Sequence, residues 1–125
     1  MNLFEEGAFT LHSGGTSKFR INCEELKDKD LSALALLAVE IVGPFRMVIP
    51  ILRGGNGFAH ALLPHKTKEG CILICDDVYT TGSSFREYEG LFNKGEIKGI
   101  CIFARREITI PWVQSIFTFN PSLKE

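Results

Sequence analysis

Two adjacent acids and a hydroxyl-rich turn follow one apolar run, and these residue types together could bind a phosphorylated sugar. The run opens the segment CILICDDVYTTGSS, residues 71–84, and predicts a strand buried on both faces of a parallel sheet. Asp76 and Asp77 fall at its carboxyl end, where carboxylates could bind ribose hydroxyls or a magnesium shell. Residues 80–84 supply small side chains and free backbone amides before a predicted helix, where an anion is favoured.

This segment resembles the phosphoribosyl pyrophosphate (PRPP) signature of the type I phosphoribosyltransferases, an apolar strand followed by two acids, two apolar residues and T-T-G-x-S/T. The resemblance implies that Asp76 and Asp77 are catalytic and contact the ribose 2′- and 3′-hydroxyls, while the turn wraps the 5′-phosphate. The implied ribose-phosphate site contains Asp76, Asp77, Val78, Tyr79, Thr80, Thr81, Gly82, Ser83 and Ser84. Tyr79 replaces the family's usual aliphatic residue, and its ring could line the sugar pocket or pack behind it.

A purely structural interpretation of the same residues is that the acids only start a turn and that Ser84 only caps a helix. Ser84 and Glu87 do fit a capping box, so the sequence predicts such a cap. Capping alone does not require two acids, two threonines and a glycine in this order, which favours the functional interpretation.

A glycine-rich stretch, RGGNG at residues 53–57, follows another predicted strand and should emerge at the same sheet edge as the two acids. Glycines let the backbone approach an oxyanion, and an arginine offers a planar fork of donors to a diphosphate. In the family this position is the pyrophosphate loop, so the resemblance assigns pyrophosphate binding to Arg53, Gly54 and Gly55. Taken alone, the stretch fits an ordinary tight turn equally well.

Residues 7–20, GAFTLHSGGTSKFR, resemble the N-terminal hood of orotate phosphoribosyltransferases, in which a phrase like FTLKSG-x-x-S-x-x-F precedes the core. His12 falls on the family's base-pocket lysine, although an imidazole is only partly charged near neutral pH. Arg105 falls where these enzymes carry an arginine for the orotate carboxylate, while Ala104 replaces their acid. The resemblance implies base contacts by His12, Phe19 and Arg105. The alternative for His12 is a surface residue of the hairpin. The alternative for Arg105 is a solvated charge cluster that follows a strand.

The resemblance implies an enzyme, a pentosyltransferase that moves phosphoribose from PRPP to an orotate-like nucleobase and releases pyrophosphate, as in pyrimidine biosynthesis. The implied cofactor is Mg²⁺, held mainly by PRPP and water, with Asp76 or Asp77 as a ligand directly or through water. Catalytic members insert a long mobile hairpin before the signature strand, and the stretch from Arg53 to Gly70 is too short for one. The alternative is therefore a PRPP- or nucleotide-binding regulatory module without turnover.

Composition predicts one globular domain with small-molecule substrates. The 125 residues are 45% hydrophobic and 23% charged, and the net charge of −1 gives no basic excess for nucleic acid or membrane surfaces. No apolar run could span a bilayer and the N-terminus is acidic, so we expect a cytoplasmic protein. The four cysteines lack C-x-x-C spacing, which predicts free thiols. A homodimer is expected by analogy with the family.

Strands alternate with helices along the chain, which predicts an α/β fold of the type I phosphoribosyltransferase kind, a mainly parallel sheet flanked by helices. Residues 1–25 are expected to form a hood hairpin, with strands at 8–12 and 17–22, and residues 26–125 the core. The other predicted strands are 47–52, 72–74, 99–104 and 115–119, and the short helices are 57–63 and 85–93. A longer helix is expected from a cap at Asp30 to Val42, with one apolar face formed by Leu31, Leu34, Leu37, Ala38 and Ile41.

Overall fold

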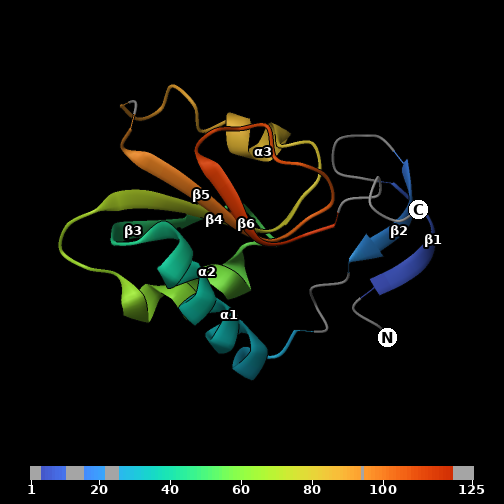
Figure 1. The fold of residues 1–125 in the computed structure, drawn as a ribbon, viewed down its shortest axis with the longest axis horizontal. Coiled ribbons are helices and arrows are strands. Elements are labelled where there is room, and N and C mark those ends of the chain that lie inside the picture. The colour runs from blue at the N-terminus through green and yellow to red at the C-terminus, as the bar shows by residue number, and fades with distance from the viewer. Residues whose placement is uncertain (1–3, 11–15, 22–25, 94, 120–125) are drawn as a thin grey trace.

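The structure is a computed structural model, and it describes residues 4–10, 16–21, 26–93 and 95–119. Its centre is a four-stranded sheet in which every neighbouring pair of strands is parallel (Figure 1). In spatial order the strands are β3 (Phe45–Pro50), β4 (Cys71–Tyr79), β5 (Ile97–Ala104) and β6 (Val113–Thr118). The predicted α/β class is confirmed, with a sheet that is wholly rather than mainly parallel.

Helices cover both faces of this sheet. The helices α1 (Asp28–Val42) and α2 (Asn56–Leu62) lie on one face, and the short helix α3 (Ser83–Arg86) lies on the other (Figure 1). A 3-10 helix, η2 (Leu63–His65), continues directly from α2. Within the described part of the chain, no helix is both long enough and apolar enough to cross a membrane.

Strand β4 is the centre of both hydrophobic cores. Leu73 and Cys75 pack toward α1 and α2, whereas Ile72 and Ile74 pack in the cluster that contains Phe85 of α3. Because both faces are covered, the strand reads as a continuous apolar run rather than an alternating one. Cys75 is a free, fully buried thiol, as predicted, and burial raises its pKa.

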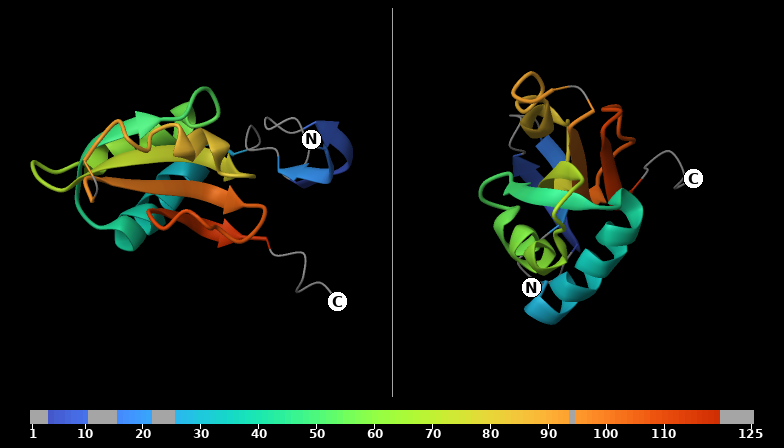
Figure 2. Two further views of the ribbon diagram at one scale, coloured as in Figure 1. Left: turned by 90° about the horizontal axis from the view of Figure 1, so that it is seen from above. Right: turned by 90° about the vertical axis from the view of Figure 1, so that its left-hand side faces the viewer.

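The predicted hairpin is present and starts earlier than expected. Strand β1 (Phe4–Thr10) pairs with β2 (Thr16–Ile21) in antiparallel register, with Glu6 opposite Phe19. In the left view of Figure 2 the hairpin lies beyond the end of the sheet to which the arrows of β5 and β6 point. His12 and the hairpin turn lie outside the described residues.

Two predictions for α1 were wrong. The N-cap is Lys27, and Asp30 is instead the third helical residue, whose carboxylate accepts the Lys27 backbone N–H at 3.0 Å. Leu37 and Ile41 were expected on the buried face but are 49% and 37% exposed. The buried positions are Ala35, Ala38 and Val42. Apolar residues run most of the way around this helix, so the sequence pattern could not select the face that packs.

The predicted helix 85–93 and its Ser84 cap were also wrong. The helix α3 has only four residues and begins after Gly82, which adopts a left-handed conformation with φ of +86°, so Ser84 lies inside the helix. The chain from Glu87 onward forms turns, and Gly90 has φ of +87°. After Arg86 the backbone changes to turns, with the Tyr88 N–H donating to the Phe85 carbonyl oxygen at 3.0 Å, and the left-handed Gly90 then keeps the aromatic periodicity at 85–92 from resuming as a helix.

Candidate functional site

The two predicted loops meet because their strands are neighbours. In the parallel pairing of β3 with β4, Ile49 lies opposite Ile74 and Pro50 opposite Cys75. The Ile51 N–H continues this pairing by donating to the Cys75 carbonyl oxygen at 2.8 Å. The residues that follow each strand therefore emerge side by side at the carboxyl end of the sheet, where open parallel sheets bind ligands.

Glycines allow the loop after β3 to lie directly against β4. A Cβ atom built on Gly54 would lie 2.6 Å from both carboxylate oxygens of Asp77. A Cβ on Gly55 would lie 2.6 Å from the Cys75 carbonyl oxygen. The peptide bond between Leu52 and Arg53 is cis. Neither glycine can carry a side chain without movement of the strand or of its acid.

The acid doublet Asp76-Asp77 is half-buried, and one oxygen of each carboxylate accepts a hydrogen bond from the next backbone N–H. The Asp77 N–H donates to Asp76 Oδ1 at 2.8 Å, and the Val78 N–H donates to Asp77 Oδ1 at 2.7 Å. Burial, followed by the neighbouring Asp77 side chain, raises the pKa of Asp76 to about 8. Near neutral pH Asp76 therefore holds a proton that a positively charged ligand would displace.

Two cavities share Gly54 and Asp77 in their walls. The first has a volume of about 130 Å³ and is lined by Ile51, Leu52, Gly54, Asp76, Asp77, Val78, Thr80 and Ser84. The second has a volume of about 320 Å³ and is lined by Leu26, Leu31, Arg53, Gly54, Gly57, Phe58, Asp77 and Ile102. The first is mainly polar and faces the 80–84 turn, while the second adds an arginine to apolar walls.

The 80–84 turn presents hydroxyl groups beside the first cavity. Thr80 and Ser84 line that cavity, and Thr81 and Ser83 are exposed and joined by their hydroxyls at 3.2 Å. The helix dipole invoked from the sequence is small here, because α3 has only four residues. Hydroxyl groups and the turn backbone are therefore the main features available to an anion.

Tyr79 is buried in the core and is not among the residues that line the first cavity. Its side chain is 2% exposed and lies in the core cluster with Phe85 and Ile110. Of the two alternatives that the sequence left open, the structure has the packing one.

The predicted base contacts of His12, Phe19 and Arg105 remain a prediction. Arg105 is 9% exposed, and burial, with a smaller effect of Arg106, lowers its pKa. Of the described residues, Arg105 is not among those that line either cavity. Phe19 lies in β2, and His12 is outside the described residues.

Sequence reasoning missed the apolar walls of both cavities. Ile51 and Leu52 line the first cavity, and Leu31 and Phe58 line the second. Ile51 and Leu52 had been predicted to continue the strand, which ends at Pro50. Pro50 carries no N–H for a ladder and was the available signal that the strand stops there.

Comparisons with solved structures identify the fold. The orotate phosphoribosyltransferase from Aeropyrum pernix has a TM-score of 0.71 and 22% identity, over 93% of this chain and 88% of that one. The Mycobacterium tuberculosis enzyme of the same name has a TM-score of 0.67 and 15% identity, over 94% and 90%. The Francisella tularensis enzyme has a TM-score of 0.59 and 19% identity, over 94% and 81%.

No protein-family model matches the sequence, and a search of curated proteins finds no match. The likeness is therefore one of architecture at low sequence identity. The chain has the fold of the type I phosphoribosyltransferases, as seen in these orotate phosphoribosyltransferases.

Proposed function

We propose that this protein binds PRPP and transfers its phosphoribosyl group to a nucleobase, with release of pyrophosphate. The single observation that carries the proposal is the cavity shared by Asp76, Asp77 and the hydroxyls of Thr80 and Ser84, with Gly54 against Asp77. Carboxylates accept hydrogen bonds from the two ribose hydroxyls, and the turn receives the 5′-phosphate. Arg53, on the second cavity, is suitably charged for the pyrophosphate.

The donor groups at this site fit a magnesium ion that arrives with its substrate. Among the described residues, no three His, Cys, Asp or Glu side chains gather closely enough to hold a metal. Two carboxylates on the cavity wall suit Mg²⁺, which keeps several waters and prefers phosphate oxygens. When bound, the ion would neutralise charge on the pyrophosphate. Asp76 and Asp77 would contact it directly or through water.

The proposed reaction is a displacement at the anomeric carbon of the ribose. The bond to the pyrophosphate oxygen breaks, pyrophosphate leaves with the electron pair, and the lone pair of a base nitrogen forms the new bond with inversion. A neutral base then loses its N–H proton to water. The protein contributes mainly orientation and charge, because Asp76 and Asp77 fix the ribose while Arg53 faces the leaving group.

An orotate-like base is the finer part of the proposal. It is supported by the hood-like motif at residues 7–20 and by the names of the similar structures. The apolar walls of the second cavity, which include Leu31 and Phe58, suit the planar ring of such a base.

A binding module without turnover is the second candidate, and one observation favours it. The connection from η2 to β4, where the catalytic members insert their lid, is attached to the opposite end of the sheet. Both the Thr67 N–H and its hydroxyl donate to the Phe45 carbonyl oxygen, at 2.7 and 3.2 Å, and Arg46 donates to the Gly70 carbonyl oxygen. Phe45 begins β3, so this connection cannot cover the carboxyl-end site. An open site would admit water during the reaction.

Calorimetry and a turnover assay separate these candidates. We expect PRPP to bind only when Mg²⁺ is present, and Asp77→Asn to weaken binding by about tenfold or more, since charge-assisted hydrogen bonds are lost. Glu40→Gln, at an exposed acid on α1, serves as the control. Pyrophosphate release with one member of a panel of bases supports the enzyme. Binding without release for any base supports the module, and no binding contradicts both.

A further inference from the structure

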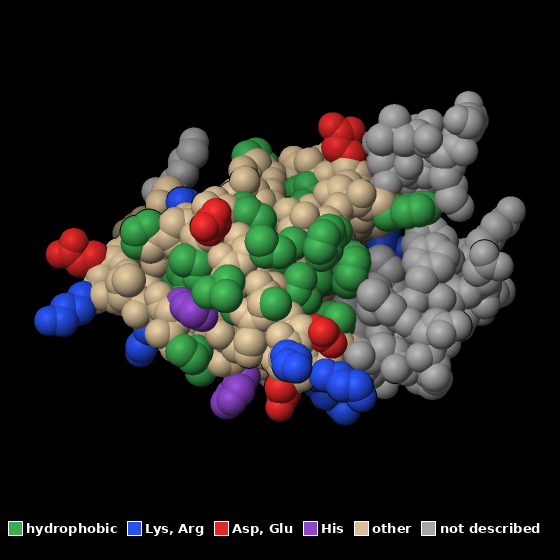
Figure 3. Space-filling model, turned by 60° about the horizontal axis from the view of Figure 1, so that its bottom comes forward, with side chains coloured by type: hydrophobic (Ala, Val, Ile, Leu, Met, Phe, Trp, Pro, Cys, Tyr) green, Lys and Arg blue, Asp and Glu red, His purple; other side chains and the backbone are tan. Residues whose placement is uncertain are grey.

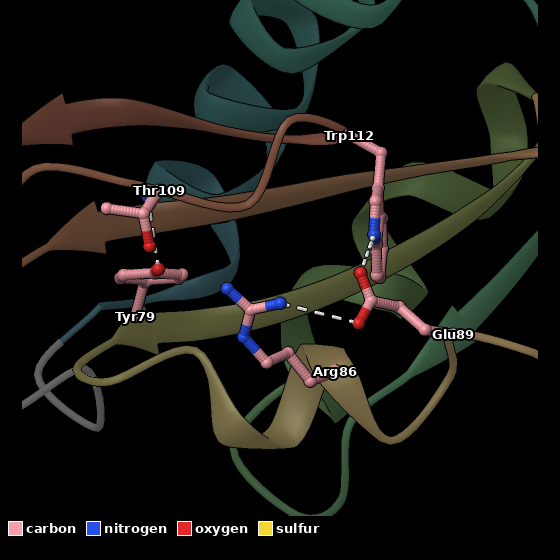
Figure 4. Close-up of polar contacts among 5 residues, drawn as sticks. All are labelled: Tyr79, Arg86, Glu89, Thr109 and Trp112. Carbon is pink, nitrogen blue, oxygen red and sulfur yellow. Dashed lines mark hydrogen bonds and ion pairs between the residues drawn. The ribbon is translucent and has the colours of Figure 1, made fainter.

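The connection between β5 and β6, residues 105–112, is hydrogen-bonded to the segment that carries the 80–84 turn. The Arg105 N–H donates to the Tyr79 carbonyl oxygen at 2.9 Å, and the Thr109 N–H donates to the Tyr79 hydroxyl at 3.4 Å. The Trp112 indole donates to Glu89 at 3.0 Å, and Glu89 also pairs with Arg86 of α3 at 3.4 Å. Figure 4 shows the three side-chain contacts, which involve Tyr79 before the turn and Arg86 and Glu89 after it.

The Tyr79 ring forms the wall directly behind this turn. It packs against Phe85 of α3 with ring centroids 6.1 Å apart, and Phe85 packs against Trp112 at 5.9 Å. A Cβ atom built on Gly82 would lie 2.7 Å from the Tyr79 hydroxyl oxygen and 2.8 Å from Ile110 Cδ1. The backbone of Gly82 is therefore held in contact with the tyrosine and with the 105–112 connection at once.

Gly82 sets the shape of the turn, because its φ of +86° directs the chain from the exposed hydroxyls into α3. Behind it, a buried hydroxyl requires a hydrogen-bond partner, and Thr109 supplies one. An aliphatic residue at position 79 would leave space behind Gly82 and remove the acceptor of the Thr109 N–H. The extra ring and oxygen at this position thus tie the turn to a second element of the sheet.

We propose that Tyr79 is a positioning residue that holds the 80–84 turn in the shape that receives the 5′-phosphate. It acts through Gly82 and through the bond to Thr109, and it does not touch the ligand. This inference rests on the proposed function, because it concerns the phosphate end of the same site.

The test compares two ligands that differ in whether they reach this turn. PRPP carries the 5′-phosphate and inorganic pyrophosphate does not. Calorimetry with Mg²⁺ would measure both affinities for the wild-type protein, Tyr79→Phe, Tyr79→Leu and the control Tyr88→Phe. Tyr88 is the other tyrosine of the chain and packs against the same core cluster as Tyr79. Tyr88→Phe therefore removes the same hydroxyl from a residue at this cluster. Thermal melts would establish that every variant is folded at the temperature used.

We expect Tyr79→Phe to weaken PRPP binding by about threefold and Tyr79→Leu by about tenfold, in line with the loss of one modest hydrogen bond and then of the ring as well. Pyrophosphate affinity should be unchanged in both, and Tyr88→Phe should match the wild type for both ligands. Unchanged PRPP affinity in both Tyr79 variants would overturn this inference and leave the proposed function standing. An equal loss of affinity for PRPP and pyrophosphate would also overturn it, because it would indicate a merely structural residue. A wild-type protein that binds no PRPP overturns the proposed function as well.

Discussion

The carboxylate of Asp77 lies so close to the backbone of Gly54 that a Cβ atom at position 54 would be 2.6 Å from both of its oxygens. Real Cβ atoms essentially never approach other atoms this closely. The loop after β3 and the acid doublet after β4 are thus one packed unit. The contact also divides the site into two cavities, which share these two residues.

This contact predicts that Gly54→Ala weakens PRPP binding by displacing the Asp77 carboxylate. We expect a loss of about tenfold, comparable to the loss of one charge-assisted hydrogen bond. The thermal midpoint should change little, because Gly54 is exposed and has φ outside the left-handed region. Calorimetry with Mg²⁺ and PRPP measures the affinity.

A double-mutant cycle isolates the cause of that loss. In an Asp77→Ala background the carboxylate is gone, so adding Gly54→Ala should reduce the affinity no further. An additive loss in the double variant would contradict displacement of Asp77 and would point to a general distortion of the loop.

The raised pKa of Asp76 predicts that Asp76→Asn stabilises the ligand-free protein at alkaline pH. Between the ordinary aspartate pKa and about 8, the folded state keeps a proton that the unfolded chain has released. Stability contributed by the neutral carboxyl is therefore complete below the ordinary aspartate pKa and is lost progressively as the pH rises from there through about 8. Asparagine stays neutral and can still accept the Asp77 N–H.

Urea unfolding of the wild type and Asp76→Asn at pH 5 and pH 8.5 measures this effect. We expect similar free energies of unfolding at pH 5 and an advantage of about 1–2 kcal/mol for the variant at pH 8.5, reduced below the full shift because water reaches part of the carboxyl. The control Glu40→Gln should match the wild-type free energy of unfolding at both pH values. If the difference in free energy of unfolding between Asp76→Asn and the wild type is the same at both pH values, the raised pKa of Asp76 is contradicted.

The same proton predicts that binding of PRPP with Mg²⁺ releases protons near neutral pH. A carboxylate must be ionised to contact the ion or to accept hydrogen bonds through both of its oxygens. The affinity for PRPP should therefore rise between pH 7 and pH 9. Calorimetry in buffers of different ionisation enthalpy measures the number of protons released. Asp76→Asn should abolish the part that comes from this residue. A binding enthalpy independent of buffer in the wild type would contradict the prediction.

The position of the site was predictable because long apolar runs fix the strands, and the residues after a parallel strand emerge at a known edge. Asp76 and Gly54 could be assigned to one cleft on that basis. The side of the sheet on which Tyr79 packs was not predictable. Strict alternation from Leu73 and Cys75 puts it toward α1 and α2, yet it packs with the opposite cluster.

The alternation breaks at the acids, where side-chain oxygens take up backbone N–H groups. The Asp77 N–H and the Val78 N–H both donate to aspartate oxygens, while β4 stays paired with β5 in constant register through Tyr79. Such local bonding depends on three-dimensional geometry that spacing does not encode. The length of α3 was also missed, because the turns that follow Arg86 and the left-handed conformation of Gly90 cannot be read from the aromatic spacing.

The orientation of α1 is the correction that mutation can test most directly. Leu36 and Leu37 are 59% and 49% exposed, whereas Ala38 is fully buried between the helix and the sheet. Figure 3 shows apolar side chains gathered on the surface of the molecule on the side of α1 and α2. Leu36→Gln and Leu37→Gln should each change the free energy of unfolding by less than about 1 kcal/mol, because little apolar contact is lost.

Ala38→Gln is the matched contrast in the same helix. It forces a larger, polar side chain into a packed interface, and we expect it to cost about 3 kcal/mol or more. Glutamine has good helix propensity, so intrinsic preference contributes little to the difference. Urea unfolding of the three variants measures it. A larger loss for Leu37→Gln than for Ala38→Gln would show that Leu37 faces the core, as the sequence predicted, and would contradict the packing of α1 described here.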